Sequence, residues 1–371
     1  MALEPSLVAA IIEDSDGQSA RMADLIAGSA SAGDAGVVVG CGTSEHAAMA
    51  VAALLRRALP GRSVRSRQAF EASLEPSSVF CLAISHEGET QATIDALRAA
   101  RAANVRTGLV TAAADSAAVT VADEVIVTPL TDASWCHTVG YLSPILAGAS
   151  VAARLAAEVL DGEGLRDRLR QVLALVPAAD EIGLRMSAAT RLIVVGSGLD
   201  AIAARELALK VEEGARLPAV ARHLETQLHG HLASADESCG VVVIVTDPLA
   251  TATRAHRAGQ LLAACHRLGM PGAAIVSESV ARDWPAGLTP AGRLVLRHPR
   301  PEVASSPVGS TLDVLATGAL ALQALAVGLI HARGTNPDAI RREEIAYREA
   351  AAIAERPMRD DQNGGQGMAG R

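Results

Sequence analysis

Short apolar runs rich in β-branched residues alternate along this chain with longer segments whose apolar residues recur every three or four positions. The first pattern predicts buried strands and the second predicts helices. The expected strands are residues 37–39, 62–65, 79–84, 107–110, 124–127, 193–195, 241–245, 273–276 and 293–296. The expected helices cover much of 1–36 and then 46–58, 91–103, 142–160 and 312–330, with an irregular segment at 132–141. Regular alternation of this kind predicts an α/β fold with parallel sheets and right-handed crossovers.

The pattern occurs twice. Val37 to Gly42 returns as Ile193 to Gly198, at an offset of 156 residues that takes Gly40 to Gly196 and Gly42 to Gly198. The later strands of the two halves also correspond, and a long Ala/Leu-rich helix closes each half. We therefore expect two tandem copies of one three-layer α/β/α unit, each with a flavodoxin-like parallel sheet. The predicted organisation is a helical segment at 1–36, a first lobe at 37–165, a second lobe at 176–335, a tail at 336–358 and a disordered end at 359–371.

Composition narrows the function classes. Only 2% of the 371 residues are aromatic and the net charge is −8, so neither base stacking nor a basic surface for nucleic acid is expected. The five cysteines form no CxxC pair, which argues against a zinc site or a disulfide framework and favours reduced thiols. Charged residues interrupt every apolar run before about 18 residues, and the N-terminus lacks the pattern of a signal peptide. We expect a cytoplasmic protein with neither a metal nor another cofactor.

Hydroxyl side chains gather where two expected strands of the first lobe end. Thr43 and Ser44 follow the Gly40–Gly42 turn, and Ser85 and Thr90 follow the strand at 79–84. Ligands of open parallel sheets bind beyond the carboxyl ends of the strands, and helix N-termini favour anions. These hydroxyls therefore predict a phosphate site, and ordinary helix capping is the alternative. The turn of the second lobe carries an acidic residue, Asp200, and is expected to lack this site.

One helical segment of the second lobe carries charges at helical spacing. Glu206, Lys210 and Glu213 fall at i, i+4 and i+7, on one face of the helix, and Lys210 is the only lysine of the chain. The alternatives are a solvated ladder of ion pairs and a group of catalytic residues.

Four stretches resemble, in order, the motifs of the sugar isomerase (SIS) family, and most nearly those of the isomerase half of glutamine–fructose-6-phosphate aminotransferases. These stretches are Gly40–Ser44, Ser85–Thr90, Ala208–Glu213 and Leu228–Gly230. The resemblance implies that Glu213 transfers protons between C1 and C2 of a sugar and that His229 assists ring opening. Because His223 and His231 lie near His229, the assignment to His229 rests on spacing. The resemblance also implies a homodimer in which this histidine loop completes the partner's site, and it adds the following ligand-binding candidates to the four hydroxyls: Cys41, Gly42, His86, Glu87 and Thr138.

The chain also departs from the family pattern. Residues 1–36 resemble no glutaminase domain, so we expect none in this chain, and no lysine stands in the tail, where the family lysine aligns near Ile345. His86 and Glu87 replace the usual Gln and Ser, and a carboxylate beside a phosphate is repulsive. Lys210 is then expected to stabilise an enediolate or to keep Glu213 ionised. Two functions follow: a phosphosugar isomerase or deaminating isomerase acting on a hexose or hexosamine phosphate, or a non-catalytic protein of the same fold that senses such a ligand.

Overall fold

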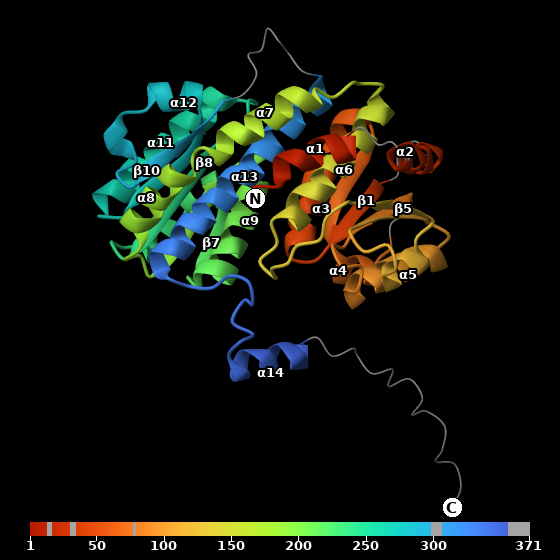
Figure 1. The fold of residues 1–371 in the computed structure, drawn as a ribbon. Coiled ribbons are helices and arrows are strands. Elements are labelled where there is room, and N and C mark those ends of the chain that lie inside the picture. Colours follow the sequence, from red (N-terminus) through yellow and green to blue (C-terminus); the bar gives the residue numbers. More distant parts are fainter. Residues whose placement is uncertain (13–16, 30–34, 77–78, 298–305, 355–371) are drawn as a thin grey trace, which may run out of the picture.

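The computed structural model describes residues 1–12, 17–29, 35–76, 79–297 and 306–354, and it contains two five-stranded sheets (Figure 1). Their strand orders are β2-β1-β3-β4-β5 and β10-β9-β8-β6-β7, and every pairing in both sheets is parallel. Read from β2 and from β7, the two orders are the same. The predicted α/β fold with two tandem flavodoxin-like lobes is therefore confirmed. The strands are β1 (Ala35–Gly40), β2 (Ser63–Gln68), β3 (Phe80–Ile84), β4 (Arg106–Thr111), β5 (Glu124–Val127), β6 (Arg191–Gly196), β7 (Ala219–His223), β8 (Cys239–Val245), β9 (Gly272–Ser277) and β10 (Gly292–Leu296).

Helices cover both faces of each sheet (Figure 1). The α-helices are α1 (Glu4–Ile12), α2 (Gln18–Gly28), α3 (Thr43–Ala58), α4 (Ala69–Leu74), α5 (Gln91–Ala102), α6 (Val139–Ala156), α7 (Gly162–Leu173), α8 (Val176–Met186), α9 (Asp200–Lys210), α10 (Leu224–Leu228), α11 (Thr251–Arg267), α12 (Glu278–Asp283), α13 (Pro307–Arg333) and α14 (Ile345–Ala354). A π-helical turn, η2 (Val211–Ala215), continues α9, and short 3₁₀ turns are η1 (Ala117–Val121), η3 (His231–Ser234) and η4 (Ala286–Leu288).

The boundaries of the two long apolar helices differ from the sequence-based expectation for identifiable reasons. Helix α6 ends at Ala156 rather than residue 160, because Ala157 adopts a left-handed conformation (φ 52°). Helix α13 extends beyond 312–330 at both ends, because the Ser306 hydroxyl caps its first turn and left-handed Gly334 ends it. The segment expected to be irregular up to residue 141 is already helical from Val139.

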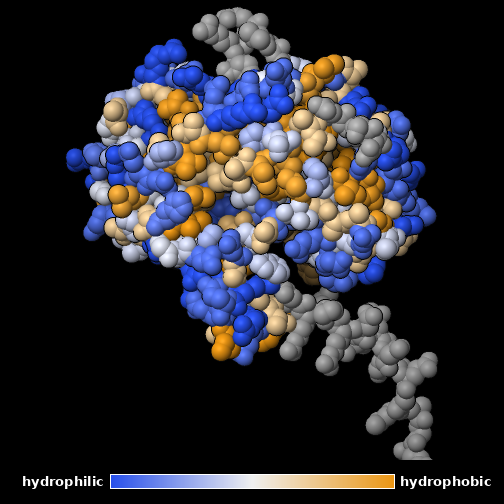
Figure 2. All heavy atoms as spheres, viewed as in Figure 1, coloured by the Kyte–Doolittle hydropathy of each residue, from blue (hydrophilic) through white to orange (hydrophobic). Residues whose placement is uncertain are grey.

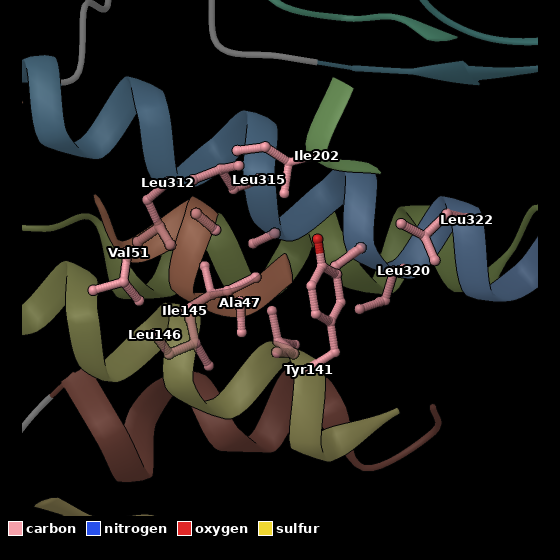
Figure 3. Close-up of a cluster of buried hydrophobic side chains, with 14 of the residues drawn as sticks. Ala47, Val51, Tyr141, Ile145, Leu146, Ile202, Leu312, Leu315, Leu320 and Leu322 are labelled. Atoms are coloured by element: carbon pink, nitrogen blue, oxygen red, sulfur yellow. The ribbon is translucent and has the colours of Figure 1, made fainter. Parts of the chain in front are cut away.

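A single large apolar core joins the two lobes. Helices α3 and α6 of the first lobe pack together, and α13 contacts α3, α6 and α9. Figure 3 shows side chains from all four helices meeting, among them Val51, Ile145, Ile202 and Leu315.

Close helix packing within the second lobe depends on small residues: the backbones of Gly183 in α8 and Gly328 in α13 touch, leaving no room for a Cβ on either.

Helices α6 and α13 are long and apolar enough to cross a membrane by length and composition. However, 83% of the apolar stretch in α6 and 89% of that in α13 are buried inside the protein. These helices therefore form the layer between the two sheets.

The C-terminal tail leaves the second lobe and crosses to the first. The Asp338 carbonyl accepts a hydrogen bond from the Trp135 amide (2.9 Å), and the Arg342 guanidinium lies 3.9 Å from the Trp135 ring centroid. Helix α14 then stands away from the body and has no buried residue (Figure 1). In the space-filling view it is a protrusion on which hydrophilic and hydrophobic side chains lie together (Figure 2). The end predicted to be disordered, 359–371, lies outside the described residues.

Candidate active site

The turn between β1 and α3 can only be made with glycine at two positions. A Cβ on Gly40 would overlap the backbone of Ser44, and Gly42 has a positive φ of 57°. The turn lies where the strand order of the first sheet reverses, between β1 and β3, which is the usual ligand-binding position in such sheets. The Cys41 thiol accepts a hydrogen bond from Gln68 (3.4 Å).

The two hydroxyls after this turn differ in their surroundings. Thr43 is buried; its Oγ1 donates to Glu206 Oε1 (3.1 Å) and accepts from Lys210 Nζ (2.9 Å). Ser44 is partly exposed, and no polar partner of its hydroxyl exists within the described part of the chain. Neither residue caps α3, since Gly42 occupies the N-cap position without a side-chain bond. The capping alternative therefore does not explain these hydroxyls.

The second loop, Ser85 to Thr90, is adjacent in the sheet. Gly88 has a positive φ of 67°, and a Cβ there would overlap the Ser116 side chain. Thr90 is the N-cap residue of α5 but makes no side-chain capping bond, which leaves its hydroxyl exposed. Ser85 is buried at the end of β3, whereas Glu87 is exposed. The loop thus offers two hydroxyls near the carboxyl end of the sheet.

Glu206 and Lys210 are fully buried, with relative exposures of 0% and 2%, so the solvated ladder of ion pairs does not occur. Lys210 Nζ lies 2.6 Å from Glu213 Oε2 and 3.4 Å from Glu206 Oε1. Glu206 Oε2 in turn lies 2.7 Å from His46 Nδ1 in α3. Together with Thr43, these groups form a polar network that crosses from one lobe to the other.

Charge pairing outweighs desolvation in this network. Burial alone would raise the pKa of Glu206, but the Lys210 charge and the hydrogen bond from His46 hold it below its usual value. Burial alone would lower the pKa of Lys210, but the carboxylates of Glu206 and Glu213 raise it. The network therefore contains an ammonium ion between two carboxylates.

Glu213 is the most exposed member of this network, with 21% of its side chain exposed against 13% for His46. It lies on η2, and π-helical turns are frequent at functional sites. Cys136 lies near it, and burial together with Glu213 and Glu206 raises the pKa of the Cys136 thiol to about 12 despite the Lys210 charge. The Cys136 thiol is therefore neutral beside the Glu213–Lys210 ion pair.

Asp132 organises the segment that leads into α6. Its carboxylate accepts hydrogen bonds from the amides of Thr138, Val139 and Gly140 and from the Thr138 hydroxyl. Burial opposes ionisation, but His137 and these amides hold the pKa of Asp132 well below its usual range. The predicted sugar-contacting residue Thr138 is therefore fixed by both of its donors.

His86 links the second loop to the segment that leads into α6. Its Nε2 accepts a hydrogen bond from the Asp132 amide (2.9 Å), and its ring packs edge-to-face on His137 at 4.9 Å. Burial, followed by the neighbouring His137, lowers the pKa of His86. The ligating atoms of His86, Asp132 and His137 lie within 4.8 Å of one another, a donor set that metals accept. However, the lone pair of His86 Nε2 already accepts an amide, so we interpret the cluster as a hydrogen-bonded brace.

His229 lies apart from the network. Its side chain is 76% exposed at the end of α10, and its Nε2 lies 3.2 Å from Glu225 Oε2 of the same helix. Within the described residues no hydrogen bond or ion pair joins His229 to Glu213.

The second lobe uses its equivalent turn differently from the expectation. Asp200 is buried and points to the end of β8, where it accepts from Thr246 and from the Asp247 amide. The acidic group at the turn is instead Asp247, whose Oδ2 accepts from the Leu199 amide (3.0 Å) and pairs with Arg254 (2.5 Å). Three residues were not predicted from the sequence as site residues: Asp247, His46 and Asp132. The Glu45-His46 dipeptide directly after Ser44 was a signal for one of the three.

Comparison with solved structures identifies this architecture. The C-terminal domain of glucosamine-fructose-6-phosphate aminotransferase from Francisella tularensis superposes with a TM-score of 0.74 at 21% identity, over 91% of this chain and 96% of that one. The chain has the fold of the sugar isomerase (SIS) family. The tagatose-6-phosphate ketose/aldose isomerase of Escherichia coli shares this SIS fold (TM-score 0.71, 19% identity, 91% and 93% of the two chains). Glucosamine-6-phosphate deaminase from Thermotoga maritima gives a TM-score of 0.59 at 17% identity, over 90% and 97%.

Sequence similarity to curated proteins is partial. The chain is 28% identical over 228 residues to the isomerizing glutamine–fructose-6-phosphate aminotransferase of Symbiobacterium thermophilum. This match covers 57% of this chain and 37% of the length of that enzyme, so the chain spans little more than a third of the curated relative. No protein-family model matches the chain.

Proposed function

We propose that this protein is an isomerase of a hexose or hexosamine phosphate that moves a proton between C1 and C2 of the open-chain sugar. The observation that carries the proposal is the arrangement of Glu213. Its carboxylate is partly exposed and held 2.6 Å from the buried ammonium of Lys210, at the lobe boundary beside Thr43. An ionised carboxylate held in this way has the chemical character of a general base.

The first lobe would bind the phosphate. Ser44, Ser85 and Thr90 carry hydroxyls at the carboxyl edge of the sheet, and the backbone of Cys41 and Gly42 forms the adjoining turn. The exposed carboxylate of Glu87 would have to point away from the phosphate, as its exposure allows. Thr138, fixed by Asp132, would contact the sugar hydroxyls.

Proton transfer would then proceed at the other end of the substrate. Glu213 would remove the proton from C2 of an aldose, or C1 of a ketose, and return it to the neighbouring carbon. The Lys210 ammonium would stabilise the negative charge that develops on the enediolate oxygen. In a hexosamine phosphate, the same transfer would give an enamine and then, on protonation at C1, an imine at C2; water would hydrolyse this imine to the ketose phosphate and ammonia, which is the deaminating form of the reaction.

His229 fits this scheme only in a homodimer. Because it is exposed, and because no hydrogen bond or ion pair joins it to Glu213 within the described residues, we propose that it enters the partner's site and assists ring opening there. The proposed setting is the cytoplasm, with a sugar phosphate as the ligand and no cofactor.

The test is incubation with hexose and hexosamine phosphates, and with their unphosphorylated forms, in deuterated water. Isomerisation through an enediol incorporates solvent deuterium at C2, which NMR of product and recovered substrate detects. Incorporation that depends on the phosphate and on Glu213 is expected. Absence of exchange with every compound would overturn the isomerase proposal.

A sensor that binds without turnover is the second candidate, and one observation favours it. The tail that crosses the first lobe carries Arg341 and Arg342 but no lysine for a Schiff base with the sugar. Phosphosugar binding without deuterium exchange would establish this second function.

A further inference from the structure

A cleft lies between the lobes, at the turn of the second repeat. Its volume is about 360 Å³, and it is lined by the C-terminal half of α3, by the Gly198–Ile202 turn and by the ends of β7 and β8. These strand ends are the carboxyl edge of the second sheet, the edge at which ligands bind in such folds.

The charge of this cleft is opposite to that of the protein. Four guanidinium groups line it, from Arg56, Arg57, Arg205 and Arg254, whereas Asp247 is its one acidic residue among those described. The chain as a whole has a net charge of −8. Because Asp247 forms an ion pair with Arg254 (2.5 Å), the excess positive charge of the cleft comes from the three other arginines.

Two of those arginines are unpaired. Within the described residues, Arg57 and Arg205 have no hydrogen-bond or ion-pair partner, and Arg56 donates one bond to the Val64 carbonyl (3.0 Å). Burial and the adjacent charge of Arg57 lower the pKa of Arg56, which reflects like charges held close together. A bound anion would relieve this repulsion.

The repeat gives the cleft a counterpart. The N-terminal end of α3 meets the C-terminal end of α9 through Thr43, Glu206 and Lys210, and the cleft joins the C-terminal half of α3 to the N-terminal end of α9. Helices α3 and α9 thus run antiparallel. The glycine turn before each of them faces the C-terminal end of the other. The 156-residue offset that pairs the glycine turns takes Arg57 to Glu213. In the cleft a guanidinium therefore stands at the position that carries the carboxylate in the candidate active site.

We propose that this cleft is a second, non-catalytic site for a small phosphate monoester, held by Arg57 and Arg205 with support from Arg56. Guanidinium groups bind phosphate oxygens through charge-assisted hydrogen bonds. The apolar side chains of Ala53 and Ile202 in the lining would contact the carbon part of the ligand.

The experiment measures binding stoichiometry by isothermal titration with glucose 6-phosphate, inorganic phosphate and glucose. The Ser44→Asp variant, which introduces a charge at the candidate active site, is expected to retain one phosphate or glucose 6-phosphate per chain and to bind no glucose. Adding Arg57→Gln and Arg205→Gln is expected to weaken this remaining binding at least tenfold, as for the loss of one or more charged hydrogen bonds. Circular dichroism checks that each variant is folded.

A matched control removes two exposed arginines elsewhere, Arg101→Gln and Arg267→Gln, and should leave the binding unchanged. Binding that is insensitive to Arg57→Gln and Arg205→Gln, or equally sensitive to the control pair, would overturn the second site. Arg57→Gln and Arg205→Gln are also compared with the control pair in the wild-type background. That comparison tests the second site even if Ser44→Asp does not change binding, so a failure of the proposed first-lobe phosphate site is recognised separately.

Discussion

The Oγ1 of Thr43, at the start of the first lobe's helix α3, lies 2.9 Å from the Nζ of Lys210, at the end of the second lobe's helix α9. This contact ties the phosphate turn to the pair that we propose as catalytic. It also places a buried lysine where its charge is shared by Glu206 and Glu213.

Glu213→Gln removes the proposed base while keeping the shape of the side chain. General acid–base groups contribute about 10²–10⁴-fold, so turnover should fall at least about a hundredfold while substrate affinity changes little. Steady-state kinetics together with titration calorimetry measure the two quantities. Glu212→Gln, one residue earlier and exposed, should retain normal turnover. Full turnover of Glu213→Gln would exclude its role as the base.

Lys210→Met leaves Glu206 buried and without its cation. Breaking a buried ion pair costs about 3–5 kcal/mol, so the free energy of unfolding in urea should fall by about that amount. The double variant with Glu206→Gln should recover part of the loss, because the buried carboxylate is then neutral. Strictly additive effects of the two changes would contradict the coupling.

Ser44→Asp places a carboxylate at the N-terminal turn of α3, where Ser44 is partly exposed and its hydroxyl free. Electrostatic repulsion should largely abolish phosphosugar binding in the first lobe while the fold survives. Ala188→Asp adds the same charge at an exposed position outside the site and should have no effect. Unchanged turnover and KM in Ser44→Asp would place the phosphate elsewhere.

Mixed dimers test the role of His229. Inactive Glu213→Gln and inactive His229→Ala chains, when mixed, should regain some activity if each dimer can form one complete site. Light scattering at micromolar concentration should give the mass of two chains. A monomer, or mixtures as inactive as their parents, would refute the shared site.

Glu4 gives a pH dependence of stability. It is buried, accepts a hydrogen bond from Gln323 (3.1 Å), and burial raises its pKa to about 7. Between pH 4.5 and 7 the folded state holds a proton that the unfolded state has lost, so the free energy of unfolding should fall as the pH rises through this window. The contribution of this single group is about 3 kcal/mol at most.

Glu4→Gln is neutral at every pH and should remove this part of the dependence. The difference between wild type and variant, measured by urea unfolding at several pH values, should change across pH 4.5–7 and level off above it. The exposed Glu349→Gln serves as the control. A constant difference across the window would show that Glu4 ionises normally in the folded protein.

Local sequence signals were sufficient for nine of the ten described strands and for the glycine turns. The β-branched runs at 37–39 and 193–195 became β1 and β6, and steric overlap explains why Gly40 and Gly196 cannot carry a side chain. Strand β7 was not predicted, because its sequence Ala-Val-Ala-Arg-His contains a single β-branched residue and it lies at a sheet edge.

Contacts between residues far apart in the sequence could not be predicted from local patterns. The spacing of Glu206, Lys210 and Glu213 is equally compatible with a solvated face, and what decides between the alternatives is Thr43 and His46, about 160 residues earlier in the chain. Asp132 gave no signal because its partners are mostly backbone amides, which every sequence possesses. A carboxylate was expected at the Gly196–Gly198 turn of the second lobe and was assigned to Asp200. In the structure the carboxylate at this turn is that of Asp247.

The apolar layer of α3, α6, α9 and α13 has a consequence for how the two repeats can be separated. Each repeat has its own sheet and its own ligand-binding edge, and so resembles a portable module. Yet α13 of the second repeat packs against α3 and α6 of the first, and buried Thr43 bonds to buried Lys210 across the boundary, which leaves no solvent layer along which the chain could be cut. Either repeat expressed alone would expose the apolar faces of its central helices and should aggregate, and the intact chain should melt in a single cooperative transition.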